Sequence, residues 1–487
     1  MKSKFSPIMA IFLIVLLCVG TLFSGISTAQ YSNPINESAD QWRTHGGYPG
    51  GTNYNPGSAD LKNSNNIEIN WKRDLAESED TSGLLPVTDG ETIFAPAKSS
   101  VLALDQSTGK TIWSFNPSSD SNFETSPAVG QENVFAVSLN GGGIFSSPQA
   151  TLFALDSNSG DVNWKAMYPP DTWYWGPTVA GDLVYVTHGS TVVAFNKQNG
   201  EKRWEHQLEN RIWARPVVSD GNLIVGTVSG EVISIDSGSG VGVWKTETSE
   251  GEIRDIAATE QGIVISDTNS LVHIDSGSGI IDWSTEAGTD GSGFNSLAIT
   301  ENMIYASTLG STQELVGVSR SNGSVVWKRS DVGHVPDPAW TSQIAVGKNS
   351  VYFGNQNNEI YSLNRYSGEI RWKRLNSGTT MGPIITSKGL FVGSKSGSLT
   401  KMSEADNMDN DRSDTNGADS TSPSTSESDD SSLAQQEEMS RDASSSQRDS
   451  TSILDSITTY YAFLTLITVT GISIGGAAWY YWIRDRN

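Results

Sequence analysis

Short apolar runs, separated by Gly, Asn, Asp and Ser, recur along most of the chain. In residues 101–113 an alternating apolar run ends at Asp105, Gly109 follows in the turn, and a second run carries Trp113. An Asp side chain accepts hydrogen bonds from the amides ahead of it, and Gly takes the positive φ that closes the turn. This spacing predicts a β-hairpin, and the same unit returns in residues 151–164.

The hairpin repeats at a period of roughly 40 to 50 residues, which is the range of propeller blades. Each unit ends in a tryptophan, at Trp71, Trp113, Trp164, Trp204, Trp244, Trp283, Trp327 and Trp372. Two further short strands precede each hairpin, so one unit supplies four antiparallel strands. The predicted fold is therefore an all-β propeller of eight four-stranded blades, with the large indole rings wedged between neighbouring blades.

The two ends of the repeat region complement each other. The last unit has strands up to about residue 402 but no tryptophan strand, whereas the isolated run 67–72 carries Trp71 and matches that missing strand. We expect this N-terminal strand to complete the last blade, which removes an open sheet edge. Seven blades is the alternative count, if the unit with Ser319 in place of the turn Asp is degenerate.

The N-terminus has the features of an export signal. Lys2 and Lys4 precede an apolar run over residues 8–23, and Ala29 closes a cleavage site of small residues. An uncleaved anchor helix is the alternative interpretation. We expect a signal peptide over residues 1–29, an N-terminal lead-in over 30–65 and the propeller over 66–402.

The C-terminal part predicts a stalk and an anchor. Residues 403–457 are rich in Ser, Thr, Asp and Glu and nearly free of apolar side chains, as in disordered spacers. Residues 458–483 are long and apolar enough for one transmembrane helix, and Arg484 and Arg486 in the tail 484–487 favour a cytoplasmic C-terminus. This predicts a single-pass protein of the cell membrane with an extracellular propeller. The spacing of Gly471 and Gly475 also allows a helix-mediated dimer.

Charge and residue counts exclude several kinds of chemistry. The net charge of −23 argues against a nucleic-acid partner, and the acidic, lysine-poor composition favours a halophilic source. The one cysteine, Cys18, lies in the predicted signal peptide, so the mature chain has no disulfide or thiolate. The five histidines show no metal-ligand spacing, and His273 alternates within a strand as a structural residue would. We expect no catalytic residue and no metal site.

The Asp-x-x-x-Gly-x-x-x-Trp hairpins resemble those of the pyrroloquinoline-quinone (PQQ) repeat family, which includes quinoprotein alcohol dehydrogenases and the outer-membrane assembly factor of bacterial barrel insertion. Residues 41–56 also resemble the lead-in of those propellers, and the resemblance extends over about residues 40–405. It implies the propeller fold, but one fold hosts enzymes, scaffolds and sensors. The family's enzymes hold the quinone between a tryptophan and two adjacent disulfide-bonded cysteines and bind calcium through acidic and amide side chains. This chain has no such cysteine pair.

Aromatic and charged residues recur where the chain enters the innermost strand of each predicted blade. These loops form a funnel at one end of a propeller's axial channel and are the default ligand site. Rings offer stacking surfaces, and Arg and carboxylate groups fix orientation. The predicted ligand-binding residues are Glu124, Trp173, Trp175, Arg211, Trp213, Arg215, Arg254, Asp255, Asn295 and Trp340. In the alternative interpretation they fill the channel, with Arg254 paired to Asp255 or Glu124.

Two functions follow from these patterns. In the first, the propeller is a non-enzymatic binding or scaffold protein for an unidentified cell-envelope protein or surface ligand, and it needs no cofactor. In the second, it is a PQQ-dependent dehydrogenase, with calcium, tethered to the membrane. A third hypothesis is a sensor or a carbohydrate-binding module. The predicted cytoplasmic tail is too short for a sensor to signal by itself.

Overall fold

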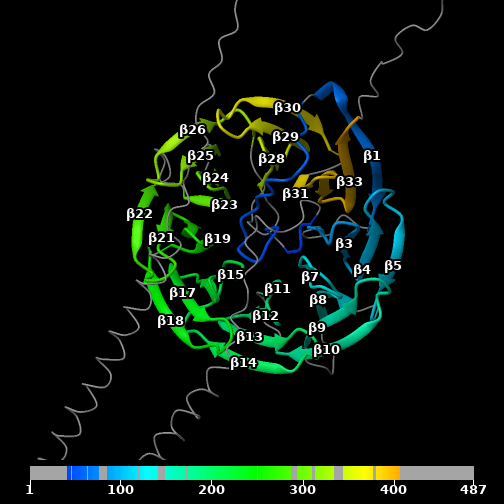
Figure 1. Cartoon of the computed structure of the whole chain (residues 1–487), viewed down its shortest axis with the longest axis vertical. Coiled ribbons are helices and arrows are strands. Elements are labelled where there is room, and N and C mark those ends of the chain that lie inside the picture. The colour runs from blue at the N-terminus through cyan, green and yellow to red at the C-terminus, as the bar shows by residue number, and fades with distance from the viewer. Residues whose placement is uncertain are drawn as a thin grey trace, which may run out of the picture. The chain divides into compact units, whose positions relative to one another are not determined.

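The computed structural model describes residues 41–44, 46–62, 64–75, 85–118, 121–140, 149–169, 174–248, 251–286, 293–309, 313–333, 344–376 and 380–405. These residues belong to one compact unit, 1–408, and form eight antiparallel sheets that follow one another around a ring (Figure 1). The predicted eight-bladed all-β propeller is confirmed, and the alternative count of seven is wrong.

The strands of the first half, after a 3₁₀ turn η2 (Ser64–Asn66), are β1 (Ile67–Asp74), β2 (Val87–Thr88), β3 (Thr92–Ala97), β4 (Ser100–Asp105), β5 (Thr111–Phe115), β6 (Ser121–Asn122), β7 (Ala128–Val129), β8 (Asn133–Asn140), β9 (Gln149–Asp156), β10 (Val162–Tyr168), β11 (Tyr174–Ala180), β12 (Leu183–His188), β13 (Thr191–Asn196), β14 (Lys202–Gln207), β15 (Val217–Ser219), β16 (Asn222–Gly226), β17 (Glu231–Asp236) and β18 (Gly242–Glu247). Those of the second half are β19 (Ile253–Thr259), β20 (Gly262–Asp267), β21 (Ser270–Ile274), β22 (Ile281–Glu286), β23 (Phe294–Ile299), β24 (Met303–Thr308), β25 (Leu315–Ser319), β26 (Val325–Arg329), β27 (Ala345–Val346), β28 (Ser350–Gly354), β29 (Glu359–Asn364), β30 (Ile370–Leu375), β31 (Thr380–Thr386), β32 (Gly389–Ser394) and β33 (Ser398–Glu404).

Each blade starts near the axis and ends at the outside of the ring. Seven sheets have four strands, and in the blade β6–β10 two short pieces, β6 and β7, both pair with β8. The inner strands are buried on both faces, as in β20, whereas the outer strands alternate, as in β22. The outermost strand of every blade carries the repeated tryptophan, so one face of this strand is committed to the neighbouring blade.

The tryptophans join each blade to the next in the same way. Each indole Nε1 donates a hydrogen bond of 2.7–3.1 Å to a backbone carbonyl, which belongs to the hairpin turn of the next blade for every tryptophan except Trp372. The ring lies over the turn glycine of that blade: a Cβ added at Gly160 would come within 2.7 Å of the Trp113 ring. The glycine also has φ +78, so it satisfies both the turn and the close approach of the indole.

The ring closes as the sequence predicts. Strand β1 pairs antiparallel with β33, with Trp71 opposite Lys401 and Arg73 opposite Leu399. The last blade therefore combines β31–β33 with the strand that precedes all others in the propeller. At the remaining interface the Trp372 indole donates to the carbonyl of Leu61 at 2.7 Å, so the lead-in supplies the acceptor that a hairpin turn supplies elsewhere.

The lead-in lies in the middle of the ring, where Figure 1 shows it in blue. Its backbone is hydrogen-bonded to the far ends of the innermost strands of seven blades, at Thr88, Val129, Val218, Ala258, Ile299, Val346 and Thr386. Trp42 is fully buried beside β2, and its amide and carbonyl exchange two bonds with Thr88. This segment consequently covers one end of the axial channel and ties the blades together.

Several predicted segments lie outside the described residues. They are the signal peptide 1–29, most of the stalk 403–457, the transmembrane helix 458–483 and the tail 484–487. Among the residues that the structure does describe, there is no helix of the length and apolarity that a membrane crossing requires.

Replacing one wedge tryptophan tests this account of the ring. Trp372 is 3% exposed, and Trp372→Ala should lower the free energy of unfolding by about 3 to 5 kcal/mol, because it empties the interface and removes the bond to Leu61. Trp372→Phe, which keeps most of the ring, should lose about 1 to 2 kcal/mol. Chemical denaturation measures both, and equal midpoints for Trp372→Ala and the parent would contradict the wedge.

Candidate functional site

The predicted ligand-binding residues lie at the beginnings of the innermost strands. Arg215 precedes β15. Arg254 and Asp255 are the second and third residues of β19, and Asn295 is the second residue of β23. The lead-in bonds to the opposite ends of these strands, so the predicted funnel is at the other end of the channel. Trp173 and Trp340 lie outside the described residues.

Arg215 reaches from its strand into the channel and meets the lead-in. It is 5% exposed, and a Cβ added at Gly46 or Gly51 would come within 2.5 or 2.7 Å of Nη2. Within the described part of the chain, Nε and Nη2 have no hydrogen-bond partner. Burial lowers the pKa of Arg215, and the negative charge of Asp255 opposes this shift. The guanidinium is therefore a buried cation held against two glycines of the lead-in.

Asp255 uses both carboxylate oxygens to bind backbone amides. Oδ1 accepts from Ile256 at 2.9 Å, and Oδ2 accepts from Leu297 of the next blade at 3.0 Å. Burial raises the pKa of Asp255 to about 6, although Arg215 and both amides act in the opposite direction. The carboxylate is thus a link between the blades β19–β22 and β23–β26.

The other predicted residues are distributed between the core and the rim. Trp175 packs, half-buried, against a cluster that includes Tyr185 and Trp204. Arg254 forms an ion pair with Glu252 at 3.1 Å, and among the described residues no ion pair joins it to Asp255 or Glu124, the partners considered from the sequence.

At the rim, Glu124 and Arg211 are exposed and Trp213 is half-buried. Glu124 accepts a hydrogen bond from Asn122. Asn295 is buried, and its carbonyl accepts from Ser266 at 2.6 Å. The structure thus brings Arg215 and Asp255 together at the channel and leaves an aromatic and basic group, Arg211 with Trp213, towards solvent.

Sequence reasoning missed the partners of these residues. The amide of Leu297 and the glycines of the lead-in carry no side-chain signal, and their roles follow from the meeting of distant segments. The Gly-rich composition of residues 46–51 was the only available hint of a close approach. Across the residues that the structure describes, no group of three His, Cys, Asp or Glu side chains is arranged to hold a metal ion.

The propeller matches a family model described as outer membrane protein assembly factor BamB. The match comprises three overlapping stretches, residues 63–210, 148–261 and 188–409, which together include all eight blades.

The chain is also similar to quinone-linked dehydrogenases over part of its length. The dehydrogenase subunit of the quinone alcohol dehydrogenase of Gluconacetobacter polyoxogenes is 28% identical over 132 residues, 27% of this chain and 18% of that protein. The 1-butanol dehydrogenase (cytochrome c) of Thauera butanivorans is 27% identical over 151 residues, 29% of this chain and 20% of that protein. The matched part is a fifth or less of the length of these relatives.

Solved structures share the fold at low identity. BamB from Moraxella catarrhalis has a TM-score of 0.55 and 16% identity, covering 69% of this chain and 97% of that one. Quinohemoprotein alcohol dehydrogenase from Comamonas testosteroni has a TM-score of 0.61 and 12% identity, covering 79% of this chain and 84% of that one. The computationally designed Ika8 protein has a TM-score of 0.55 and 13% identity, covering 68% of this chain and 99% of that one. These likenesses show the architecture alone.

Gly51→Ala tests the contact between the lead-in and Arg215. The new Cβ would meet Arg215 Nη2 at 2.7 Å and the Val217 side chain at 2.8 Å, at φ +66. We expect the free energy of unfolding to fall by about 2 to 5 kcal/mol. Gly221→Ala is the matched control, because its φ is +75 but nothing lies within 4 Å of the added Cβ, so only about 1 to 2 kcal/mol should be lost. Equal losses for the two variants would refute the close approach.

Asp255 makes stability depend on pH. Its pKa rises from 3.8 unfolded to about 6 folded, so the protonated form is favoured by folding. Ionisation of Asp255 therefore lowers the free energy of unfolding. This loss is absent below pH 4, grows between pH 4 and 6, and reaches about 3 kcal/mol above pH 6. Between pH 4 and 6 the free energy of unfolding of the parent should fall relative to that of Asp255→Asn. Above pH 6 the difference between the two proteins should stay constant. Urea unfolding at pH 4 to 8 measures this; a difference between the two proteins that does not change with pH would contradict it.

Proposed function

Because this chain belongs to the PQQ-repeat family described as outer membrane protein assembly factor BamB, we propose that it is a binding or scaffold protein without chemistry of its own. Its propeller binds a partner protein or a cell-envelope ligand through the rim of the predicted funnel. The signal peptide, the acidic stalk and the helix at 458–483 place it, in this proposal, on the outer face of a cell membrane with its C-terminus in the cytoplasm.

The observation that carries this proposal is that the two charged residues at the channel interact with other parts of the propeller. Asp255 satisfies two backbone amides, and Arg215 is buried against the lead-in, so both stabilise the propeller itself. The predicted residues turned towards solvent at the rim of the funnel include the exposed Arg211 and Glu124 and the half-buried Trp213. An arginine and a tryptophan two residues apart in one loop, on a rigid scaffold, are residue types typical of a protein or glycan contact surface.

The second candidate function is a PQQ-dependent dehydrogenase, with PQQ and calcium as cofactors. It is favoured by the similarity to the quinone alcohol dehydrogenase of Gluconacetobacter polyoxogenes. The described residues do not fit this cofactor: the carboxylate of Asp255 is occupied by Ile256 and Leu297, and Arg215 is 5% exposed. We therefore derive no reaction step at this site.

Capture of partners from native membranes tests the binding function. The full-length protein, solubilised in detergent, should retain a specific set of envelope components. Arg211→Ala combined with Trp213→Ala should reduce that retention about tenfold, because it removes the exposed cation and its neighbouring ring. Arg203→Ala on the outer strand β14 is the control, since Arg203 is also exposed but lies away from the rim, and it should change nothing.

A redox-active complex would contradict this function. The same preparation is titrated with PQQ and calcium, and quinone absorbance and dye reduction are followed with alcohols as substrates. Stoichiometric binding with turnover would establish the dehydrogenase instead. Retention that is equal in the rim variant and the parent would remove the rim from the binding surface.

A further inference from the structure

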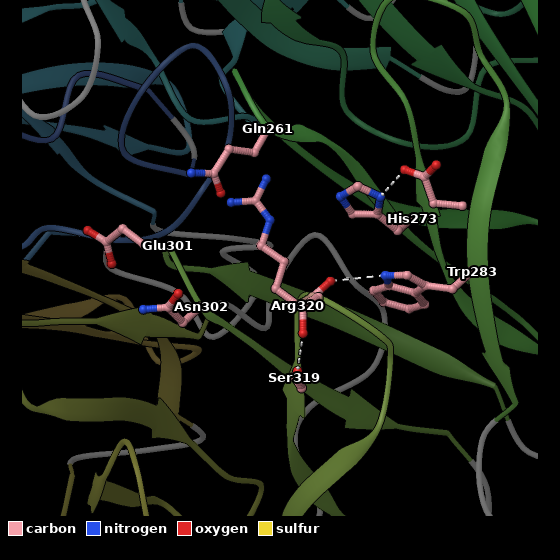
Figure 2. Close-up of a pocket in the computed structure, with 9 residues that line it drawn as sticks. Gln261, His273, Trp283, Glu301, Asn302, Ser319 and Arg320 are labelled. Atoms are coloured by element: carbon pink, nitrogen blue, oxygen red, sulfur yellow. Dashed lines mark hydrogen bonds and ion pairs between the residues drawn. The ribbon is translucent and has the colours of Figure 1, made fainter.

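A cavity of about 530 Å³ opens between the blades β19–β22 and β23–β26. Figure 2 shows the residues that line it, which are Gln261, His273, Asp282, Trp283, Glu301, Asn302, Ser319, Arg320 and Ser321. Gln261 and Glu301 follow the ends of β19 and β23, whereas Arg254 and Asn295 lie at the beginnings of these strands. The cavity is therefore at the opposite end of the blades from the predicted funnel, and its volume suits a small-molecule ligand.

The blade β19–β22 departs here from a pattern that six other blades share. In six blades an aromatic residue of the second strand packs against the wedge tryptophan, as Phe94 does against Trp113 at 5.8 Å between ring centroids. In β20 that place is taken by Val264, and the ring comes instead from His273 of β21, which stacks on Trp283 at 5.6 Å. The structural role expected of His273 is thus confirmed, and the exchange brings a polar ring into the interface.

His273 is held in place by a carboxylate. Its Nδ1 is 2.9 Å from Oδ2 of Asp282, and its Cε1 and Nε2 lie over Gly262, where an added Cβ would be within 2.8 Å. Figure 2 shows His273 and Trp283 on one side of Arg320, with Glu301 and Asn302 on the other. One wall of the cavity is therefore a fixed, flat polar surface.

Arg320 is the cation of the cavity. It is 5% exposed and directs its side chain towards Gln261 (Figure 2). Nη1 donates to the carbonyl of Thr300 at 3.3 Å and Nη2 donates to Thr259 Oγ1, both of which are neutral acceptors. Within the described residues its Nε has no partner. The charge of Glu301 acts on Arg320 without a hydrogen bond between the two side chains, so the buried guanidinium, with one unused donor, would be stabilised further by an anion that binds it directly.

The charges around Arg320 limit which anion fits. Asp282 and Glu301 also line the cavity, so a doubly charged phosphate would be repelled, whereas a single carboxylate matches the planar donors of Arg320. Glu301 is exposed at the turn between β23 and β24, where the Tyr54 hydroxyl hydrogen-bonds to it and its negative charge acts on Arg320. A carboxylate has more lone pairs than this one bond uses. The Glu301 carboxylate can therefore accept an ammonium group.

We propose that this cavity binds a small zwitterion, with its carboxylate on Arg320 and its ammonium group on Glu301. The volume accommodates a molecule of dipeptide size, whose amide can reach the side-chain amides of Gln261 and Asn302 at the mouth. The site is independent of the proposed function, because it uses neither the rim nor the channel.

Calorimetric titration of the full-length protein with glycylglycine tests the proposal at pH 7. Glycylglycine should bind, and glycylglycinamide and N-acetylglycylglycine should each bind at least about tenfold more weakly, since one lacks the carboxylate and the other the ammonium group. Arg320→Gln should weaken glycylglycine to the same degree. Glu301→Gln should weaken glycylglycine but leave the affinity for N-acetylglycylglycine unchanged.

Arg329→Gln is the control. Arg329 belongs to the blade β23–β26 as well, but it pairs with Asp331 at 2.6 Å and does not line the cavity, so this variant should bind glycylglycine as the parent does. Should Arg320→Gln fail to fold, the probe series on the parent and on Glu301→Gln still decides. Absence of glycylglycine binding to the parent, or equal affinity for the three probes, would overturn the proposal.

Discussion

The bond from each wedge indole to a neighbouring backbone carbonyl is the interaction on which the rest of this structure depends. A four-stranded blade cannot bury both faces by itself, so it is stable only when the next blade covers it. The indole covers a large apolar area, and its N–H must find an acceptor once it is buried. At seven of the eight interfaces the turn after a blade's third strand provides that acceptor together with a glycine that leaves room for the ring. At the eighth, the lead-in provides the acceptor. Eight repetitions of this contact set the angle between blades and hence the ring.

A ring built in this way has one place where the chain is discontinuous, and there the lead-in takes over. Strand β1 completes the blade of β33, and Leu61 supplies the carbonyl for Trp372. The preceding residues then cross the channel and bond to seven blades. This arrangement explains why Arg215 and Asp255, which look like ligand groups in a funnel, are used internally. The surfaces left for ligands are the rim and the cavity between blades that Arg320 lines.

The candidate site could be predicted only in part. The residue types and their recurrence at the strand entrances led to the expectation that Arg215 and Asp255 share one end of the ring with eight other residues, because equivalent positions of a repeat lie at one end, but they did not indicate that these two interact. The sequence could not show that Asp255 binds the amide of Leu297, since a backbone amide has no signature. Arg320 was missed for a related reason: it occupies a turn position behind Ser319, where the repeat suggests only a hairpin. Its burial results from Thr259 and Thr300 of two adjoining blades.

The sequence by itself determined the fold and the closing strand and favoured eight blades over seven, because these depend on periodic patterns: apolar alternation, turn residues at fixed offsets and one tryptophan per unit. Each is a local rule repeated many times, so a departure in one unit does not obscure it. The tertiary structure alone decided the path of the lead-in, the internal use of Arg215 and Asp255, and the cavity beside His273. These depend on which side chains from distant segments meet and on the space left between them, and packing of that kind is a property of the assembled ring.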